Sequence, residues 1–208
     1  MEQPNNKFAG AIRDIYGRLG PKYLQDIAEG GPPEINEFMK LLPAGGAVVD
    51  IGCAGGRDSQ IFSDSGFKVT GLDITEAFLE EARRRVPQAE FLNMDVTDIQ
   101  LPAESADAVW ANAVLLHVDK EDIPRALQNI NHILKRGGKL HIRVKQGEGT
   151  KEVVEKLTGE ERRPFIFFQK DEMEQYVTEA GFNVISSEVL PDDMGRAEVK
   201  WIKIWAEK

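Results

Sequence analysis

Acidic side chains follow apolar runs in the first half of the sequence, and their spacing suits the binding of a nucleoside. Residues 48–59 read VVDIGCAGGRDS, so an apolar run leads through Asp50 into a glycine-rich turn. Glycine lets the backbone bend sharply and approach a ligand without interference from a Cβ atom. Asp73 stands 21 positions after Gly52, at the end of the next apolar run. An acid at that spacing can accept hydrogen bonds from the two ribose hydroxyls of a nucleoside.

A third acid, Asp95, ends a further apolar run in the segment NMDVTD. Two ligand classes fit these acids, a nicotinamide dinucleotide and S-adenosylmethionine. A dinucleotide site requires G-x-G-x-x-G, but the run from Gly52 reads GCAGGR and has Arg57 in place of the third glycine. The carboxylate of Asp50 would also repel a pyrophosphate, whereas it suits a sulfonium compound that carries an amino group. The residues therefore favour S-adenosylmethionine.

Strands must bring these acids together, and strand patterns alternate with helix patterns from Ala47 onward. Apolar runs predict strands over 47–53, 67–73, 89–95, 107–113, 139–145, 182–189 and 199–206. Helical periodicity predicts helices over 75–86, with Thr75 as N-cap, and over 122–136 and 170–180. This alternation predicts an α/β fold with a mostly parallel sheet covered by helices on both faces. No helix separates the last two strands, so we expect an antiparallel pair at one edge.

The predicted strand KLHIRVK has an unusual polar face. Its apolar residues alternate with Lys139, His141, Arg143 and Lys145, whereas a central parallel strand is usually apolar on both faces. Two explanations stay open. Either acidic partners and aliphatic stems cover the polar face, or part of the sheet is open there.

The N-terminal segment, residues 1–42, has helical patterns broken by glycine and proline. Ile35, Phe38 and Leu42 lie at helical spacing and are expected to pack on the sheet. We divide the chain into this helical lid segment and a domain over 43–208, which together form one unit. The part before Gly30 is cut by glycines suited to hinge motion, so we expect residues 1–29 to form a mobile lid.

Composition limits the other possibilities. The 208 residues carry a formal charge of −9, which disfavours general affinity for nucleic acid. Cys53 is the only cysteine, so a disulfide framework or a multi-cysteine zinc site within one chain is excluded, and we expect no metal. No apolar run approaches membrane-spanning length and no signal peptide is visible, which favours a soluble cytoplasmic protein. A monomer and a homodimer both remain possible.

Five motifs in order give the sequence its resemblance to a known family. They are DIGCAGG at 50–56, GLDIT at 71–75, NMDVTD at 93–98, DAVWANAVLLHV at 107–118 and LKRGGKLHI at 134–142. This pattern resembles the class I S-adenosylmethionine-dependent methyltransferases, and the tail is similar to a bacterial and archaeal subgroup of small methyltransferases. The resemblance implies a Rossmann-like sheet of seven strands in the order 3-2-1-4-5-7-6, with the seventh antiparallel.

The resemblance also implies a set of cofactor-binding residues. Asp73 would bind the ribose, Ile74 would pack on the adenine, and Asp95 would lie at the adenine amino group. The remaining members of the set are Asp50, Gly52, Cys53, Ala54 and Gly56 in the first motif, the backbone of Val96, and Ala111 and Asn112 beside the methionyl part. Ala54 replaces the middle glycine of the family motif.

Catalytic and acceptor residues are predicted from side-chain chemistry and from position. His117 follows the fourth strand and is a candidate general base, with a structural loop histidine as the alternative. Glu148 follows the fifth strand and could bind a cationic acceptor or act as a base. Arg162 and Arg196, like the neighbouring Arg163, could pair with an anionic acceptor or be surface charges. By resemblance, Tyr16 and Tyr23 would belong to the lid.

The expected function is methyl transfer from S-adenosylmethionine to an N, O or S atom of a small-molecule acceptor. The fourth strand is followed by neither an NPPY-like nor a DPPY-like tetrapeptide, which by resemblance disfavours base or glutamine methylation. One alternative is a non-catalytic protein that binds the cofactor. A less favoured alternative is an NAD-dependent oxidoreductase.

Overall fold

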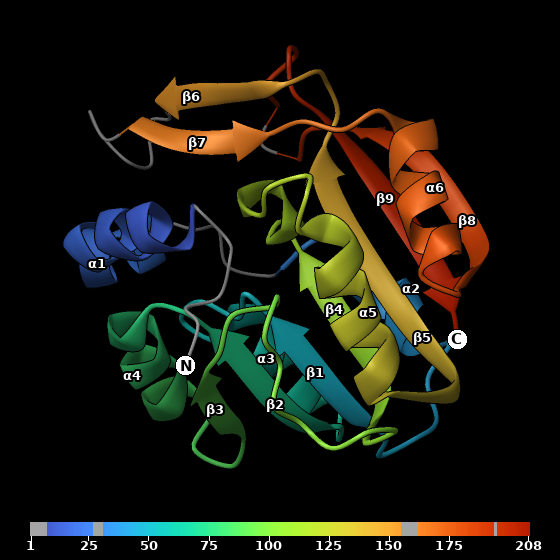
Figure 1. Cartoon of the computed structure of the whole chain (residues 1–208). Coiled ribbons are helices and arrows are strands. Elements are labelled where there is room, and N and C mark those ends of the chain that lie inside the picture. Colours follow the sequence, from blue (N-terminus) through green and yellow to red (C-terminus); the bar gives the residue numbers. More distant parts are fainter. Residues whose placement is uncertain (1–7, 27–30, 155–161, 194) are drawn as a thin grey trace.

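A computed structural model describes residues 8–26, 31–154, 162–193 and 195–208. All seven predicted strands form, and they build one sheet in the order β3-β2-β1-β4-β5-β9-β8 (Figure 1). Strands β1 to β5 are parallel, while β9 runs antiparallel to both β5 and β8. The expected order and the antiparallel edge pair are confirmed. The bounds are β1 Ala47–Ile51, β2 Lys68–Asp73, β3 Glu90–Asn93, β4 Ala106–Asn112, β5 Leu134–Lys145, β8 Asn183–Pro191 and β9 Lys200–Glu207.

Helices cover both faces of this sheet. Helices α5 and α6 pack on one face, in the largest apolar cluster, and α2 and α3 pack on the other, with α4 beside β2 and β3 (Figure 1). The bounds are α1 Ala9–Asp26, α2 Ile35–Met39, α3 Arg57–Asp64, α4 Glu76–Arg85, α5 Ile123–Ile133, α6 Lys170–Glu179 and the 3₁₀ helix η1 Leu115–His117. None of the helices described is long and apolar enough to cross a membrane.

Helix α5 is shorter than its periodicity predicts. The prediction continued to residue 136, but α5 ends at Ile133, and Leu134 has the extended backbone angles φ −73° and ψ 138°. Leu134 begins β5 and pairs with Ala106 of β4. Leu134 and the residues after it thus belong to β5, because strand pairing outweighs the helical propensity that predicted a longer α5.

Helix α1 is more continuous than its glycines suggest. It passes through Gly10 and Gly17 and has one kink at Gly20, where φ is 53° and ψ is −153°. Ile12 and Ile15 are buried, so tertiary packing outweighs the low helix propensity of glycine. In α2, Ile35 and Phe38 pack on the sheet as expected.

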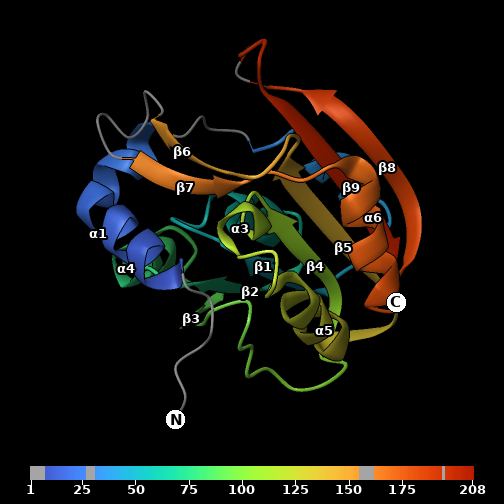
Figure 2. The ribbon, with the colours of Figure 1, turned by 45° about the horizontal axis from the view of Figure 1, so that its top comes forward.

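A hairpin that the sequence patterns did not predict lies beyond the carboxyl ends of the strands. Strands β6, Thr150–Val154, and β7, Arg162–Ile166, pair antiparallel, and β7 extends beside α1 (Figure 2). Pro164 lies inside β7, and proline argues against a strand unless the strand is at an edge. A two-stranded ribbon has such edges, so it tolerates the proline.

The polar face of β5 is covered by aromatic and acidic side chains. The ring of His141 stacks on Trp110 with 3.6 Å between ring centroids, and Nε1 of Trp205 donates a hydrogen bond of 3.0 Å to Nδ1 of His141. Arg143 forms an ion pair with Glu34 of 3.5 Å. The first of the two explanations therefore holds, with aromatic rings in addition to the acids.

Candidate active site

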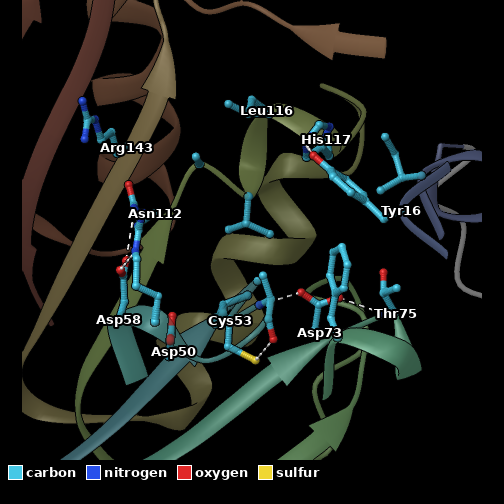
Figure 3. A pocket seen from close by; sticks show the side chains of 18 of the residues that line it. Tyr16, Asp50, Cys53, Asp58, Asp73, Thr75, Asn112, Leu116, His117 and Arg143 are labelled. Atoms are coloured by element: carbon cyan, nitrogen blue, oxygen red, sulfur yellow. Dashed lines mark hydrogen bonds and ion pairs between the residues drawn. The ribbon is translucent and has the colours of Figure 1, made fainter. Parts of the chain in front are cut away.

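A cavity of about 600 Å³ lies at the carboxyl ends of β1, β2 and β4. Helix α1 and strand β7 complete its walls, so segments far apart in the sequence enclose one space. In Figure 3, Asp50, Asp58 and Asn112 lie on one side, Asp73 and Thr75 on the other, and Tyr16 and His117 above them. This is the edge at which open α/β sheets bind ligands.

The turn after β1 adopts the backbone that its glycines predict. Gly52 has φ 71°, and a Cβ atom there would lie 2.7 Å from Cβ of Val114. Ala54, which replaces a family glycine, has φ 45°. Gly52, Cys53 and Ala54 line the cavity, but Gly56 does not. Gly56 precedes α3, and a Cβ atom there would lie 3.1 Å from Cβ of Ala82 in α4, so this glycine allows close packing of the turn against α4.

Asp73 joins the turn to the end of β2. Its carboxylate accepts hydrogen bonds from the backbone N–H groups of Ala54, at 3.0 Å, and of Thr75, at 2.8 Å. Burial raises the pKa of Asp73, and these hydrogen bonds oppose the rise. Thr75 stands at the N-cap of α4 but makes no side-chain capping bond, contrary to its predicted role.

Two further carboxylates form a close pair on the opposite side. Asp50 accepts a hydrogen bond of 2.6 Å from Ser59, and Asp58 accepts bonds from Nε1 of Trp110 at 2.9 Å and Nδ2 of Asn112 at 3.0 Å. Burial, and then the charge of Asp58, raises the pKa of Asp50 to about 7. Sequence reasoning missed Asp58, although its place in the first turn of the helix after the glycine turn was an available signal.

The third acid and its neighbours also line the cavity. Asp95 accepts hydrogen bonds from N and Oγ1 of Thr97, at 2.8 and 2.7 Å, and Ile74 and Val96 lie in the same wall. The predicted position of Ala111 beside the methionyl part is corrected, because its side chain is fully buried in the core that α5 covers. Successive residues of a strand point to opposite faces, so only its neighbour Asn112 lines the cavity.

His117 belongs to a chain of polar contacts that starts on β7. Nη1 of Arg163 donates a hydrogen bond of 2.6 Å to the hydroxyl of Tyr16, and that hydroxyl lies 3.1 Å from Nε2 of His117. Nδ1 of His117 lies 3.3 Å from the carbonyl oxygen of Pro164. Burial, reinforced by the charge of Arg163, lowers the pKa of His117 to about 3. A neutral imidazole with its proton on Nδ1 satisfies every contact.

Two predicted acceptor residues lie outside the cavity. Glu148 is exposed and accepts a hydrogen bond of 3.4 Å from Gln169, and Arg162 is exposed and lies 3.9 Å from Glu152. Arg163 lines the cavity instead, because adjacent residues of β7 point to opposite faces. Arg196 does line the cavity, where it forms an ion pair of 2.7 Å with Asp192. Tyr16 and Tyr23 line it as well.

The residues present fit a cationic nucleoside. Oδ1 of Asn112 and Oγ1 of Thr75 are buried in the cavity wall and have no hydrogen-bond partner among the described residues. Unsatisfied buried oxygens of this kind are acceptors for a ligand. Together with the four carboxylates they suit amino and hydroxyl donors. The fold and the residues of the cavity together define an α/β protein whose site suits a nucleoside that carries a positive charge.

Sequence comparison agrees with this class. Residues 49–142 match the family described as Methyltransferase domain. This match and the fold support a class I S-adenosylmethionine-dependent methyltransferase, and S-adenosylmethionine as its cofactor. Malonyl-[acyl-carrier protein] O-methyltransferase of Enterobacter lignolyticus is 32% identical over 132 residues, which are 62% of this chain and 51% of the relative. The chain thus matches about half the length of that relative.

Solved structures share the fold. A methyltransferase of Methanosarcina mazei aligns with a TM-score of 0.75 at 20% identity and covers 87% of this chain and 99% of its own. The 1,6-didemethyltoxoflavin-N1-methyltransferase of Burkholderia thailandensis, solved with bound 1,6-didemethyltoxoflavin and S-adenosylhomocysteine, aligns with a TM-score of 0.71 at 19% identity over 100% of this chain and 91% of its own.

Proposed function

We propose that this protein transfers the methyl group of S-adenosylmethionine to an N, O or S atom of a small-molecule acceptor. The observation that carries the proposal is the cavity at the carboxyl edge of the sheet, where acids from β1, β2, α3 and the segment after β3 converge. The named activities of the malonyl-[acyl-carrier protein] and 1,6-didemethyltoxoflavin relatives support a small acceptor or a small carried group.

Each cofactor-binding residue has a proposed role that its position supports. Asp73 holds the ribose and Ile74 packs on the adenine, while Asp95 and the backbone of Val96 bind the adenine amino edge. Asp50 and Asn112 bind the amino group of the methionyl part. Each of these residues lines the cavity, and Asn112 presents an unsatisfied oxygen there.

The protein's own task in the reaction is alignment and exclusion of water. S-adenosylmethionine supplies a methyl group that its sulfonium already activates for displacement. The chain must therefore position the acceptor atom in line with that methyl group. Tyr16 and Tyr23 of α1 cover the cavity, with Tyr23 stacked 5.9 Å from Phe78 between ring centroids, which supports the lid proposed for residues 1–29. Residues 1–7 and 27–29 of that segment lie outside the described residues.

We assign His117 a positioning role rather than the predicted role of general base. A base works best when its pKa lies near the working pH, and the pKa of His117 is about 3. Its Nε2 atom also contacts Tyr16. His117 therefore orients the tyrosine that closes the cavity.

Calorimetry and an acceptor screen test the proposed function. The protein should bind S-adenosylhomocysteine and S-adenosylmethionine but not NAD, and transfer of a labelled methyl group should occur to at least one member of a small-molecule acceptor panel. NAD binding without S-adenosylhomocysteine binding would favour the oxidoreductase. Tight cofactor binding without transfer across the panel would favour a non-catalytic binding protein.

A further inference from the structure

Three N–H donors converge on the carboxylate of Asp58, in the first turn of α3. Its Oδ2 atom accepts a hydrogen bond of 2.9 Å from Nε1 of Trp110 and one of 3.0 Å from Nδ2 of Asn112. Its Oδ1 atom accepts a bond of 2.7 Å from Nε of Arg57. The side chain of Asp58 is only 9% exposed, and hydrogen bonds to a buried charged group are strong. These bonds hold the carboxylate in one place.

The alternation of side chains along β4 explains why two of its residues reach the same acid. Trp110 and Asn112 are two positions apart, so their side chains lie on the same face of the sheet. Helix α3 packs on that face, where the ring of Phe62 lies 5.6 Å from the ring of Trp110 between centroids. The helix thereby places Asp58 beside Asn112 (Figure 3).

The amide of Asn112 can take only one orientation beside this carboxylate. A carboxylate only accepts hydrogen bonds, whereas an amide has NH₂ donors at one end and an oxygen acceptor at the other. Asp58 therefore fixes Nδ2 of Asn112 on its own side and leaves Oδ1 at the other end of the amide. That oxygen is buried in the cavity wall and has no hydrogen-bond partner among the residues that the structure describes. The amide thus offers a ligand an acceptor and not a donor.

Asp58 also affects the second residue proposed to bind the amino group of the cofactor. After burial, the charge of Asp58 is the next cause that raises the pKa of Asp50. A raised pKa leaves Asp50 less ionised near neutral pH, which opposes binding of an ammonium group by this carboxylate. The hydrogen bond from Asn112 to Asp58, by contrast, favours an ammonium group, because it turns the amide oxygen away from α3.

We infer that Asp58 is a positioning residue of the cofactor site, which holds the amide oxygen of Asn112 toward the amino group of the methionyl part. The inference rests on the proposed function, in which Asp50 and Asn112 bind that group. Without Asp58, the amide would be free to rotate by half a turn and present N–H groups, which repel a cation. Asp58 thus acts on the cofactor through Asn112.

Calorimetry with two nucleosides tests this inference at about pH 8, where Asp50 is mostly ionised. S-adenosylhomocysteine carries the amino group, whereas 5′-methylthioadenosine has the same adenosine and thioether but lacks the amino acid part. Asp58→Ala should bind S-adenosylhomocysteine about tenfold more weakly, the scale of one hydrogen bond to a charged group. Its affinity for 5′-methylthioadenosine should change by less than about twofold. A merely structural role would weaken binding of both nucleosides alike.

A double-mutant cycle shows whether Asp58 acts through Asn112. Asn112→Ala removes the acceptor and should also weaken binding of S-adenosylhomocysteine about tenfold. Adding Asp58→Ala to this variant should cause little further loss, because both substitutions remove the same interaction. A full further loss in the double variant would show that Asp58 acts by its charge instead, and would overturn the inference.

Two further variants complete the design. Asp64→Ala is the matched control, because it removes an exposed acid from the same helix, and it should leave both affinities unchanged. Asp58→Ala leaves Nε1 of Trp110 buried without this acceptor, which lowers stability. If Asp58→Ala does not fold, the same cycle is measured in the Trp110→Phe background, which lacks that donor.

The outcomes separate the inference from the function on which it rests. Unchanged affinity of Asp58→Ala for S-adenosylhomocysteine, or an equal loss for both nucleosides, would overturn the positioning role. Failure of the wild-type protein to bind either nucleoside is a different result, because it would overturn the proposed function itself.

Discussion

Hydrogen bonding separates the four carboxylates at the carboxyl ends of β1, β2 and β3 and in α3 into two kinds. Asp73 and Asp95 each accept a backbone N–H bond from a residue two positions later, so they fix their own turns. Asp50 and Asp58 instead accept bonds from side chains, and burial together with the charge of Asp58 raises the pKa of Asp50. The first kind suits recognition of neutral hydroxyl and amino groups, and the second suits binding of a cation.

Removal of Asp73 should weaken cofactor binding. Asp73→Ala should reduce the affinity for S-adenosylhomocysteine by about 1.5–3 kcal/mol, because hydrogen bonds to a charged group are lost. Calorimetry measures the change. Asp98→Ala is the control, since Asp98 is an exposed acid in the loop after β3. Unchanged affinity in a folded Asp73→Ala protein would remove Asp73 from the ribose site.

The affinity for the cofactor should depend on pH through Asp50. The pKa of Asp50 is raised to about 7, so the protonated fraction of this carboxyl grows as the pH falls below 7. A protonated carboxyl attracts an ammonium group weakly, so affinity for S-adenosylhomocysteine should fall by up to about tenfold per pH unit between pH 7 and pH 5.5.

Calorimetry across this range would compare the wild type with Asp50→Asn. The variant should bind more weakly at pH 8 and show little dependence on pH, since it has no proton to exchange at this position. An equally steep pH dependence in Asp50→Asn would show that another group controls binding.

At the scale of elements, the turn between β1 and α3 depends on close packing against the segment after β4. Gly52 and Val114 approach so closely that a side chain at position 52 has no room. Both Gly52 and Ala54 have positive φ, but only Ala54 shows that a side chain is tolerated. The two positions therefore respond differently to substitution.

Gly52→Val should destabilise the protein and abolish cofactor binding. A β-branched residue at φ 71° costs about 1–2 kcal/mol in backbone strain, and overpacking against Val114 adds about 1–3 kcal/mol. Thermal unfolding and calorimetry measure both effects. Ala54→Gly, which restores the family residue, should change stability by less than about 1 kcal/mol. Normal binding by Gly52→Val would contradict the structure of this turn.

At the scale of the whole molecule, three separate parts enclose the cavity. The sheet edge supplies the floor, α1 comes from the N-terminus, and β7 is part of the hairpin inserted between β5 and α6 (Figure 2). Tyr16 contacts both His117 and Arg163, so it joins all three parts. The enclosure of the cavity therefore depends on contacts between segments that are far apart in the sequence.

Hydrogen exchange should show α1 becoming more protected when S-adenosylhomocysteine binds, while the sheet changes little. Deletion of residues 1–29 should leave a folded protein, because the sheet core does not need them, with weaker cofactor binding and little or no transfer. Exchange on the full chain and calorimetry on the truncated chain are the measurements. Full affinity and full turnover after truncation would show that the segment only packs.

The sequence by itself determined the sheet and the cofactor edge. Strand and helix periods are local properties, and the glycine turn, Asp73 and Asp95 lie at strand ends, so the motifs placed Ile74, Val96 and Asn112 in the cavity wall. Local patterns predicted too long a helix for α5. They could not show that Leu134 pairs with Ala106, because Ala106 belongs to a strand that is distant in the sequence.

Only the tertiary structure decided which side chains of β5 and β7 reach the cavity. Whether Arg162 or Arg163 faces the cavity depends on the register of β7, and a shift of one residue reverses the faces of a strand. The low pKa of His117 arises from burial beneath α1 and from charges on β5 and β7, which are remote in sequence. The convergence of Lys145 and Arg163 on Phe165 likewise needs two elements to meet. Such properties come from long-range contacts, which no local residue pattern specifies.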